Sequence, residues 1–186
     1  VSGKGGVSSR TNGEHETGYF ANLQIEKNSG KLFYGIEQSI ISDKFNSNDL
    51  GYLRRNNEMN TEAYINYNII KPAWIYREMH VNLRWEHERV FRPNEAAGHS
   101  AGMNFFTQLK NNYHIELNFE FHGNFHDYYE PRVGGRYYTE PYYYQSAFWV
   151  GSDYRKPLFG SVSFSFAKQP DTDQRFREGE FELNLR

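Results

Sequence analysis

The sequence predicts an all-β fold, an antiparallel up-and-down meander of about nine strands that forms a transmembrane β-barrel or part of one. Two observations lead to this prediction. Apolar and polar residues alternate with a period of two along most of the chain. The connections between these segments are short and long in alternation. Successive side chains of a strand point to opposite faces, so this alternation gives one apolar face and one polar face. A helix would mix the two sets around its circumference.

The clearest predicted strand is centred near Leu117. There Ile115, Leu117 and Phe119 alternate with Glu116, Asn118 and other polar residues. The same pattern places strands, in chain order, at residues 17–27, 31–42, 60–71, 75–89, 99–110, 113–124, 143–154, 158–168 and 178–186. Residues 1–16 are expected to be flexible or to form a partial strand.

Turn-forming residues occupy the links between these strands. The links at 28–30, 72–74, 111–112 and 155–157 are short, and links this short join antiparallel strands. Longer segments stand between them, at 43–59, 90–98, 125–142 and 169–177. Short turns at one end of the strands and long loops at the other are typical of outer-membrane barrels. Aromatic residues near the predicted strand ends, such as Trp74, Tyr142 and Trp149, suit the interfacial girdles of these barrels.

The composition is that of a folded chain whose apolar surface lies in large rings. Of the 186 residues 38% are hydrophobic, and the mean hydropathy is −0.86. Such values are typical of disorder, but 18% of the residues are aromatic, and disordered chains are poor in aromatics. A net charge of −2 gives no electrostatic footprint for nucleic acid. The lack of cysteine excludes a disulfide scaffold, cysteine-ligated zinc and thiol catalysis.

Alternation alone leaves two classes of protein open. A soluble sheet with one buried face shows the same pattern, so the alternative is a soluble β-sandwich or barrel that binds carbohydrate through exposed aromatics. A hydrolase built on such a scaffold is a third hypothesis. Bacterial single-chain barrels have an even number of strands. The predicted count is odd, so the chain is expected to be incomplete as a barrel. The domain assignment is accordingly a single β-barrel domain, or a fragment of a larger barrel, over residues 1–186.

Several motifs resemble those of one known family. The segments are Glu26-Lys27-Asn28-Ser29-Gly30, Phe45-Asn46-Ser47-Asn48-Asp49-Leu50-Gly51-Tyr52-Leu53-Arg54-Arg55, Tyr129-Glu130-Pro131-Arg132, Arg136-Tyr137-Tyr138 and Ser152-Asp153-Tyr154-Arg155-Lys156. Together they resemble the barrel of a large outer-membrane family of the Bacteroidota that is catalogued as a domain of unknown function. Members of that family resemble fusions of an N-terminal carbohydrate-binding module, of the family-9 type, with this barrel. That module is not in this sequence.

The resemblance covers most of residues 17–186. One departure is Ser42-Asp43-Lys44, because the family commonly has serine-proline before the phenylalanine. The resemblance implies a location in the outer membrane of a Gram-negative bacterium, with membrane lipid as a partner. It implies no established biochemical activity, and transport, envelope assembly and surface binding are the functions that fit it.

The best candidate for ligand binding is the loop at residues 125–142. Its candidate contact residues are Tyr129, Arg132, Arg136 and Tyr138. Tyrosine offers an apolar ring with a hydrogen-bonding tip, and arginine offers bidentate contacts. The expected partner is a glycan or another envelope protein. The alternative is a loop that packs its own rings.

A second candidate is a structured loop that contains Asn48, Asp49 and Gly51. The first two residues can cap their own backbone, and the glycine permits an unusual φ. We expect this loop to fix strand register, and the alternative is a plug or a ligand-contacting loop. His114, Glu116, Glu120 and His122 share one strand face, but they lack the close spacing of a metal site. No catalytic motif occurs, so no enzyme activity, cofactor or metal is expected.

Overall fold

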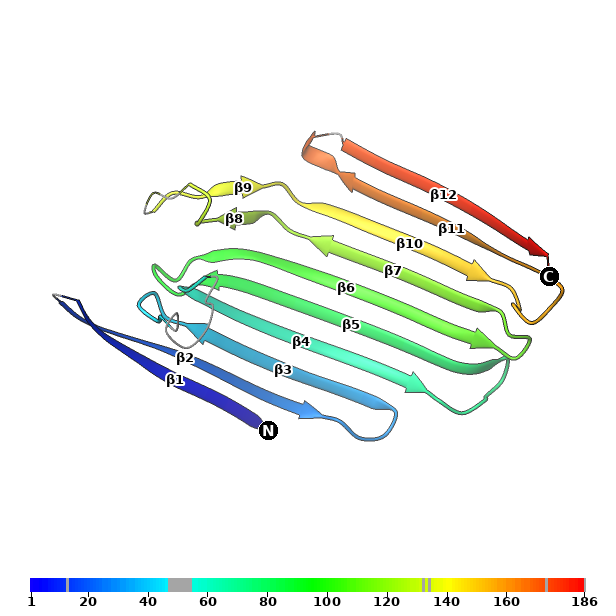
Figure 1. The fold of residues 1–186 in the computed structure, drawn as a ribbon, viewed down its shortest axis with the longest axis horizontal. Coiled ribbons are helices and arrows are strands. Elements are labelled where there is room, and N and C mark those ends of the chain that lie inside the picture. Colours follow the sequence, from blue (N-terminus) through cyan, green and yellow to red (C-terminus); the bar gives the residue numbers. More distant parts are fainter. Residues whose placement is uncertain (13, 47–54, 132, 134, 173, 186) are drawn as a thin grey trace.

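A computed structural model describes residues 1–12, 14–46, 55–131, 133, 135–172 and 174–185. Ten strands form one large antiparallel sheet, in which each strand pairs with the next one along the chain (Figure 1). A two-stranded hairpin, β8–β9, is inserted between β7 and β10. The predicted all-β antiparallel meander is therefore confirmed. The large sheet is open, with β1 at one edge and β12 at the other, so a closed barrel is not observed.

The strands vary from short loop strands to long strands of the main sheet. The large sheet contains β1 (Ser2–Asn12), β2 (Glu14–Lys27), β3 (Leu32–Ile41), β4 (Glu58–Ile69), β5 (Tyr76–Val90), β6 (Ala96–Leu109), β7 (His114–His122), β10 (Tyr143–Gly151), β11 (Leu158–Gln169) and β12 (Gln174–Leu185). The inserted hairpin contains β8 (Phe125–Asp127) and β9 (Tyr138–Glu140), and a single 3-10 turn, η1 (Pro170–Thr172), precedes β12. No helix in the described part of the chain is long and apolar enough to cross a membrane.

The structure has more strands than the nine predicted. Nine strands of the large sheet, β2–β7 and β10–β12, correspond to the nine predicted segments. The additions are β1, β8 and β9. β1 is rich in glycine and serine and has one large apolar residue, Val7, so it carries no alternating pattern. Its eleven residues are held by antiparallel pairing with β2, from Ser2 opposite Gln24 to Asn12 opposite Glu14.

The two ends of the sheet differ. The short turns β2–β3, β4–β5, β6–β7 and β10–β11 lie at one end, on the right of Figure 1, together with the C-terminus. The connections β3–β4, β5–β6, β7–β10 and β11–β12 lie at the other end. Of these, β3–β4 and β7–β10 are long, whereas β5–β6 and β11–β12 are short because β6 and β12 begin inside the segments 90–98 and 169–177 predicted as longer links. Trp74 and Asn112 in the short turns have positive φ, at 46° and 62°.

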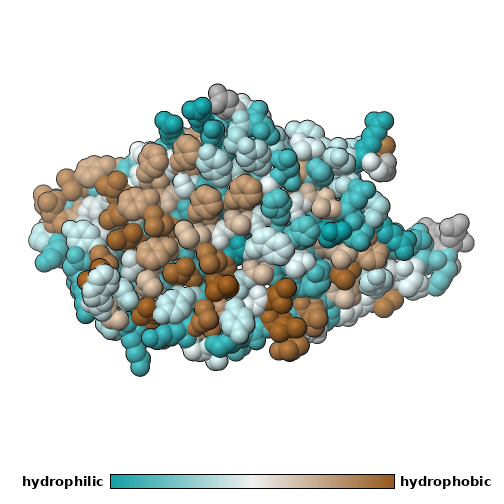
Figure 2. Space-filling model, turned by 180° about the vertical axis from the view of Figure 1, so that it is seen from behind, coloured by the Kyte–Doolittle hydropathy of each residue, from teal (hydrophilic) through white to brown (hydrophobic). Residues whose placement is uncertain are grey.

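The alternation in the sequence becomes two continuous faces. One apolar row runs across four strands through Ile65, Leu83, Met103 and Phe119, and the adjacent polar row runs through Asn66, Asn82, Asn104 and Asn118. Figure 2 shows apolar side chains spread over the face seen from behind. The polar face carries hollows of about 530, 300, 370 and 380 Å³.

The apolar face has no second layer of described residues packed on it. The buried apolar residues are Phe45, Ile69, Val90 and Ala97, which lie near strand ends or in the loops. Leu23, Ile65 and Phe164, in contrast, are about half exposed, at 51%, 49% and 49%. The fold therefore lacks the conventional core of a water-soluble protein, in which large apolar side chains are buried.

Candidate functional site

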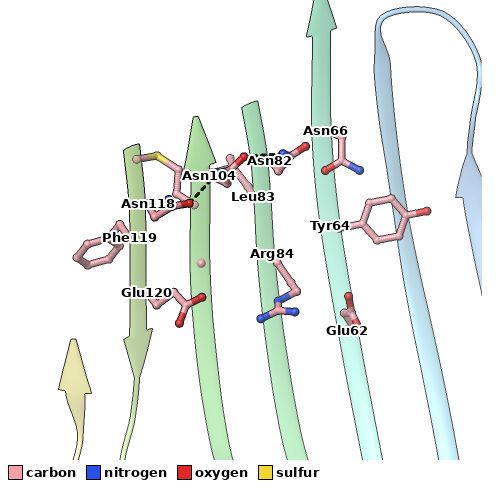
Figure 3. Close-up of a pocket in the computed structure, with 12 residues that line it drawn as sticks. Glu62, Tyr64, Asn66, Asn82, Leu83, Arg84, Asn104, Asn118, Phe119 and Glu120 are labelled. Atoms are coloured by element: carbon pink, nitrogen blue, oxygen red, sulfur yellow. Dashed lines mark hydrogen bonds between the residues drawn. The ribbon is translucent and has the colours of Figure 1, made fainter. Parts of the chain in front are cut away.

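A hollow of about 530 Å³ lies at the centre of the polar face, over β4–β7 (Figure 3). Its polar lining comprises Glu62, Tyr64, Asn66, Asn82, Arg84, Asn104, Asn118 and Glu120. These side chains share a face because all of them have even residue numbers in strands whose register pairs even with even, so they lie side by side. The hollow is thus a direct product of the alternating sequence.

Three asparagines form a hydrogen-bonded row across this hollow. Asn82 Nδ2 donates to Asn104 Oδ1 at 3.0 Å, and Asn104 Nδ2 donates to Asn118 Oδ1 at 2.6 Å. The row ends on a carboxylate, because Asn118 Nδ2 donates to Glu116 Oε1 at 2.9 Å. Figure 3 shows the row crossing from strand to strand. Since an amide both donates and accepts, the row fixes these side chains and leaves the remaining oxygens and N–H groups for water or a ligand.

Arg84 is the cation of this hollow. It stands in register between Tyr64 and Gly102, and Glu120 lies opposite Gly102 on the next strand. Arg84 is exposed and makes no ion pair or side-chain hydrogen bond with any described residue. Its guanidinium is therefore free to contact a solute in the hollow.

Glutamates dominate the charge of the polar face. By strand register the face carries Lys4, Arg10 and Arg84 against a larger set of glutamates, namely Glu16, Glu26, Glu37, Glu58, Glu62, Glu78, Glu86, Glu88, Glu116, Glu120, Glu178, Glu180 and Glu182. A wall lined mostly by one sign of charge raises the local concentration of oppositely charged solutes. The polar face can therefore form hydrogen bonds with a solute and attract cations.

In this sheet the apolar side chains are more exposed than the polar side chains beside them, the reverse of what a water-soluble sheet shows. Asn66, Asn82, Asn104 and Asn118 are half-buried. The residues beside them in sequence, Ile65, Leu83, Met103 and Leu117, are 49%, 41%, 38% and 36% exposed. The polar side chains are therefore packed more closely together than the apolar side chains of the same strands.

Of the predicted binding residues, Tyr129 is turned inward. Its hydroxyl donates to the backbone carbonyl of Asn56, and the Arg55 guanidinium lies 4.7 Å from its ring centre. Its backbone N–H donates to Asp127 Oδ1 at 2.7 Å. Burial raises the pKa of Tyr129, and the Glu58 carboxylate adds to this. Tyr129 thus ties the β7–β10 loop to the segment that leads into β4.

Arg136 and Tyr138 lie on the surface of the same loop. Tyr138 is 57% exposed and stands opposite Asp127 in the β8–β9 hairpin. The backbone N–H of Arg136 closes a turn onto the Val133 carbonyl at 3.1 Å, and its side chain is exposed. No contact between described residues joins either of them to the Tyr129 side chain. Their binding role stays a prediction.

Four predicted site residues fall outside the described part of the chain. They are Arg132 in the β7–β10 loop, and Asn48, Asp49 and Gly51 in the β3–β4 connection. The predictions for them, ligand contact for the first and a structured loop for the others, therefore stand as made.

A comparison with protein families identifies the chain. A family described as a domain of unknown function (DUF5916) matches residues 1–186. The chain belongs to the DUF5916 family. No curated protein and no solved structure matches it. The DUF5916 match spans all of the segments on which the family resemblance rests, and it carries no activity with it.

The DUF5916 domain pairs histidines with single carboxylates on its polar face. His80 Nε2 lies 3.8 Å from Glu78 Oε2, and His122 Nε2 lies 3.6 Å from Glu120 Oε2. Within the described ranges, no group of three or more His, Asp or Glu side chains could hold a metal ion. These pairs add charged and polar groups to the polar face.

The sequence prediction missed a second hollow of the DUF5916 domain, which contains Trp149. The prediction placed Trp149 in an interfacial girdle at a strand end. In the structure it stands on the polar face, in register with Glu116 on β7 and Ser163 on β11. The signal was available in the sequence, since Trp149 has the same strand parity as Gln145 and Ala147, and Gln145 is polar.

Proposed function

We propose that this domain is the wall of an outer-membrane β-barrel in a Gram-negative bacterium, with its apolar face against lipid and its polar face lining a wet interior. The barrel would serve transport, envelope assembly or surface binding. The observation that carries the proposal is the inverted exposure, because a chain that leaves Ile65 and Leu83 more exposed than Asn66 and Asn82 needs an apolar solvent on that side.

Strand length supports the proposal. The strands of the large sheet have 9 to 15 residues, and a tilted strand of about 9–11 residues spans the hydrocarbon core. The longer strands leave a few residues for the interface and for water. The two long connections, β3–β4 and β7–β10, lie at the same end of the sheet, which supports the proposal in the same way.

In a transmembrane barrel the two edge strands of this sheet, β1 and β12, cannot stay unpaired. Closure removes free edges from transmembrane barrels, because unpaired N–H and C=O groups are too costly in lipid. β1 and β12 must therefore pair, either with each other or with further strands. For the surface-binding function, the family resemblance suggests a glycan as the ligand class, and Arg136 and Tyr138 are the exposed described residues that could contact it.

Tryptophan fluorescence in bilayers tests the lipid contact. Trp85 lies on the apolar face, opposite Ala63 and Ala101, and Trp149 lies on the polar face. Their exposures are similar, at 42% and 37%, so a difference in quenching would report the surrounding medium rather than burial. Single-tryptophan variants of the full-length protein would be reconstituted in lipid with brominated acyl chains.

We expect brominated lipid to quench Trp85 and spare Trp149, and aqueous iodide to do the reverse. Equal quenching of both residues by bromine, or quenching of neither, would contradict a lipid-facing apolar surface. The second outcome, with Trp85 also shielded from iodide, would instead support the alternative of a soluble protein whose apolar face is covered by another protein layer.

A further inference from the structure

A separate hollow of about 370 Å³ lies on the polar face at the short-turn end of the sheet. Its lining includes Phe106, His114, Trp149, Tyr154, Glu182 and Asn184. They come from β6, β7, β10, β12 and the β10–β11 turn, which meet near the C-terminus in Figure 1. Elements far apart in sequence therefore combine at this one place.

Aromatic rings form one side of this hollow. The His114 ring lies among the other three. Its centre is 6.3 Å from the ring centre of Phe106, 6.4 Å from that of Trp149 and 6.4 Å from that of Tyr154. The interplanar angles are 30°, 44° and 25° in the same order. The rings thus make a continuous surface of π-faces and edges within a cavity large enough for a small organic molecule.

A glycine makes room for the tryptophan ring. A Cβ built on Gly151 would lie 2.4 Å from Trp149 Cη2 and 2.8 Å from its Cζ2, so the indole covers Gly151. Strand neighbours on one face are close enough for a large ring to reach across them. Glycine at position 151 therefore sets where the indole lies.

The charge around the rings is negative. Glu182 is the charged residue of the lining, and its Oε1 accepts a hydrogen bond from Asn184 Nδ2 at 3.0 Å. Glu116 and Glu180 flank Trp149 in the cross-strand register, on either side of the Trp149–Ser163 pair. Among the described residues that line the hollow, none is lysine or arginine. Aromatic faces and carboxylates both attract cations, and organic cations without N–H groups prefer aromatic faces.

We propose that this hollow binds a small organic cation of the quaternary ammonium class. The rings supply cation–π contact and apolar surface for the N-methyl groups, and Glu182 supplies the opposite charge. A neutral sugar would stack on the rings but gain nothing from the carboxylate, and an anion would be repelled. The inference goes beyond the proposed function and does not depend on it, because the hollow lies on the polar face whatever covers the other face.

The test compares choline with its uncharged isostere, 3,3-dimethyl-1-butanol, on the full-length protein in detergent at constant ionic strength. Calorimetry follows the wild type, and fluorescence follows a variant in which Trp149 is the single tryptophan. We expect saturable binding of choline that is about tenfold tighter than that of the isostere. Equal affinities, or no saturable binding of choline, would overturn the proposal. Binding of glucose without choline would make the hollow a sugar site and overturn it too.

Two variants and a matched control locate the site. Glu182→Gln should weaken choline several-fold and leave the isostere unchanged, because it removes the charge and keeps the shape. Gly151→Ala should weaken both, because its Cβ displaces the indole. Glu62→Gln, in the central hollow, should leave choline binding intact, and an equal loss there would reduce the effect to general electrostatics and overturn the site. Folding of each variant is checked by its thermal transition. Quenching by brominated lipid is a separate readout, so either proposal can fail alone.

Discussion

At the scale of single residues, Asp153 shows how the short-turn end is held together. Its carboxylate accepts hydrogen bonds from Arg155 Nε and Nη2, both at 2.8 Å, and from Asn112 Nδ2 at 3.1 Å. Asn112 belongs to the β6–β7 turn and Asp153 to the β10–β11 turn, so the contact joins two neighbouring hairpins. The hydrogen bond from Arg155, with that from Asn112, holds the pKa of Asp153 well below its usual range.

This lowered pKa gives stability a pH dependence of known sign. The charged carboxylate stabilises the folded state above the ordinary aspartate pKa of about 4, and that contribution is lost as the pH falls toward the folded-state value. Asp153→Asn should be less stable than wild type near neutral pH, and the difference should shrink as the pH falls below about 4. Urea midpoints measured across this range check it. Asp171→Asn, at an exposed site in η1, is the control, and an unchanged difference at low pH would contradict the assignment.

At the scale of elements, Gly18 in β2 shows how a loop is seated on the sheet. A Cβ at this position would lie 2.1 Å from the Phe45 backbone nitrogen and 2.3 Å from the Lys44 carbonyl carbon, so the segment after β3 crosses directly over the glycine. Tyr19 N donates to Ser42 Oγ, and Ser42 N donates to Tyr19 O, both at 2.9 Å. The segment after β3 is therefore held against β2 both by its contact with Gly18 and by two hydrogen bonds between Ser42 and Tyr19.

Gly18→Ala should destabilise the fold, because the added methyl group meets backbone that has no free rotamer to adopt. The expected cost is about 1–3 kcal/mol, as for other overpacked sites. Gly179→Ala in β12 is the matched control, since its Cβ would meet nothing nearer than 3.9 Å. Chemical denaturation of both variants measures the difference. A Gly18→Ala variant as stable as Gly179→Ala would contradict the placement of residues 44–45.

Substitutions on the two faces of β7 should differ in their cost to stability. Leu117 lies on the apolar face between Phe105 and Phe148, and Asn118 lies on the polar face between Asn104 and Ala147. In a bilayer, Leu117→Arg should cost about 2–4 kcal/mol. Asn118→Arg should cost about 1 kcal/mol, because it gives up hydrogen bonds but keeps its charge in water. Unfolding from lipid vesicles compares the two, and equal costs would argue against lipid on the apolar face.

Strand alternation was enough to predict most of the sheet, and its failures have physical causes. The predicted segment 158–168 corresponds to β11, Leu158–Gln169, because alternating serines and large apolar residues specify both faces. β1 has no such pattern, and its order comes from hydrogen bonds to β2 that only the folded chain reveals. β8 and β9, with three residues each, are too short for any period to be detected.

The candidate site was harder to predict, because the partners of loop rings lie far away in sequence. Tyr129 and Tyr138 look alike as sequence, but Tyr129 contacts Asn56, 73 residues away, and Tyr138 is exposed. Tyr128 likewise donates to Glu95 Oε2 at 2.7 Å, and burial and this carboxylate raise the pKa of Tyr128 to about 12. Composition identifies a tyrosine-rich loop, but tertiary contacts decide which rings remain available for a ligand.

At the scale of the whole molecule, the long connections pack against one another. Asn57, before β4, exchanges two hydrogen bonds with the Arg92 backbone, at 2.9 and 2.7 Å. The β8–β9 hairpin stacks His126 on Tyr137, with ring centres 4.2 Å apart, and Phe125 lies over Gly98 at the start of β6. One end of the sheet thus carries both long connections, β3–β4 and β7–β10, and the other end carries connections of four to six residues.

This asymmetry predicts an orientation in the outer membrane. Barrels place short turns in the periplasm and longer loops outside the cell, so the exposed residues Val133 and Asp171 should face the medium, and Ser29 and Lys156 should face the periplasm. The chain contains no cysteine, so single cysteines at these four positions can be labelled without background. A membrane-impermeant maleimide should label Val133→Cys and Asp171→Cys on intact cells. It should reach Ser29→Cys and Lys156→Cys only after the outer membrane is permeabilised. Labelling of all four positions on intact cells, or the reverse pattern, would contradict the orientation, and equal labelling of all four in detergent is the control for reactivity.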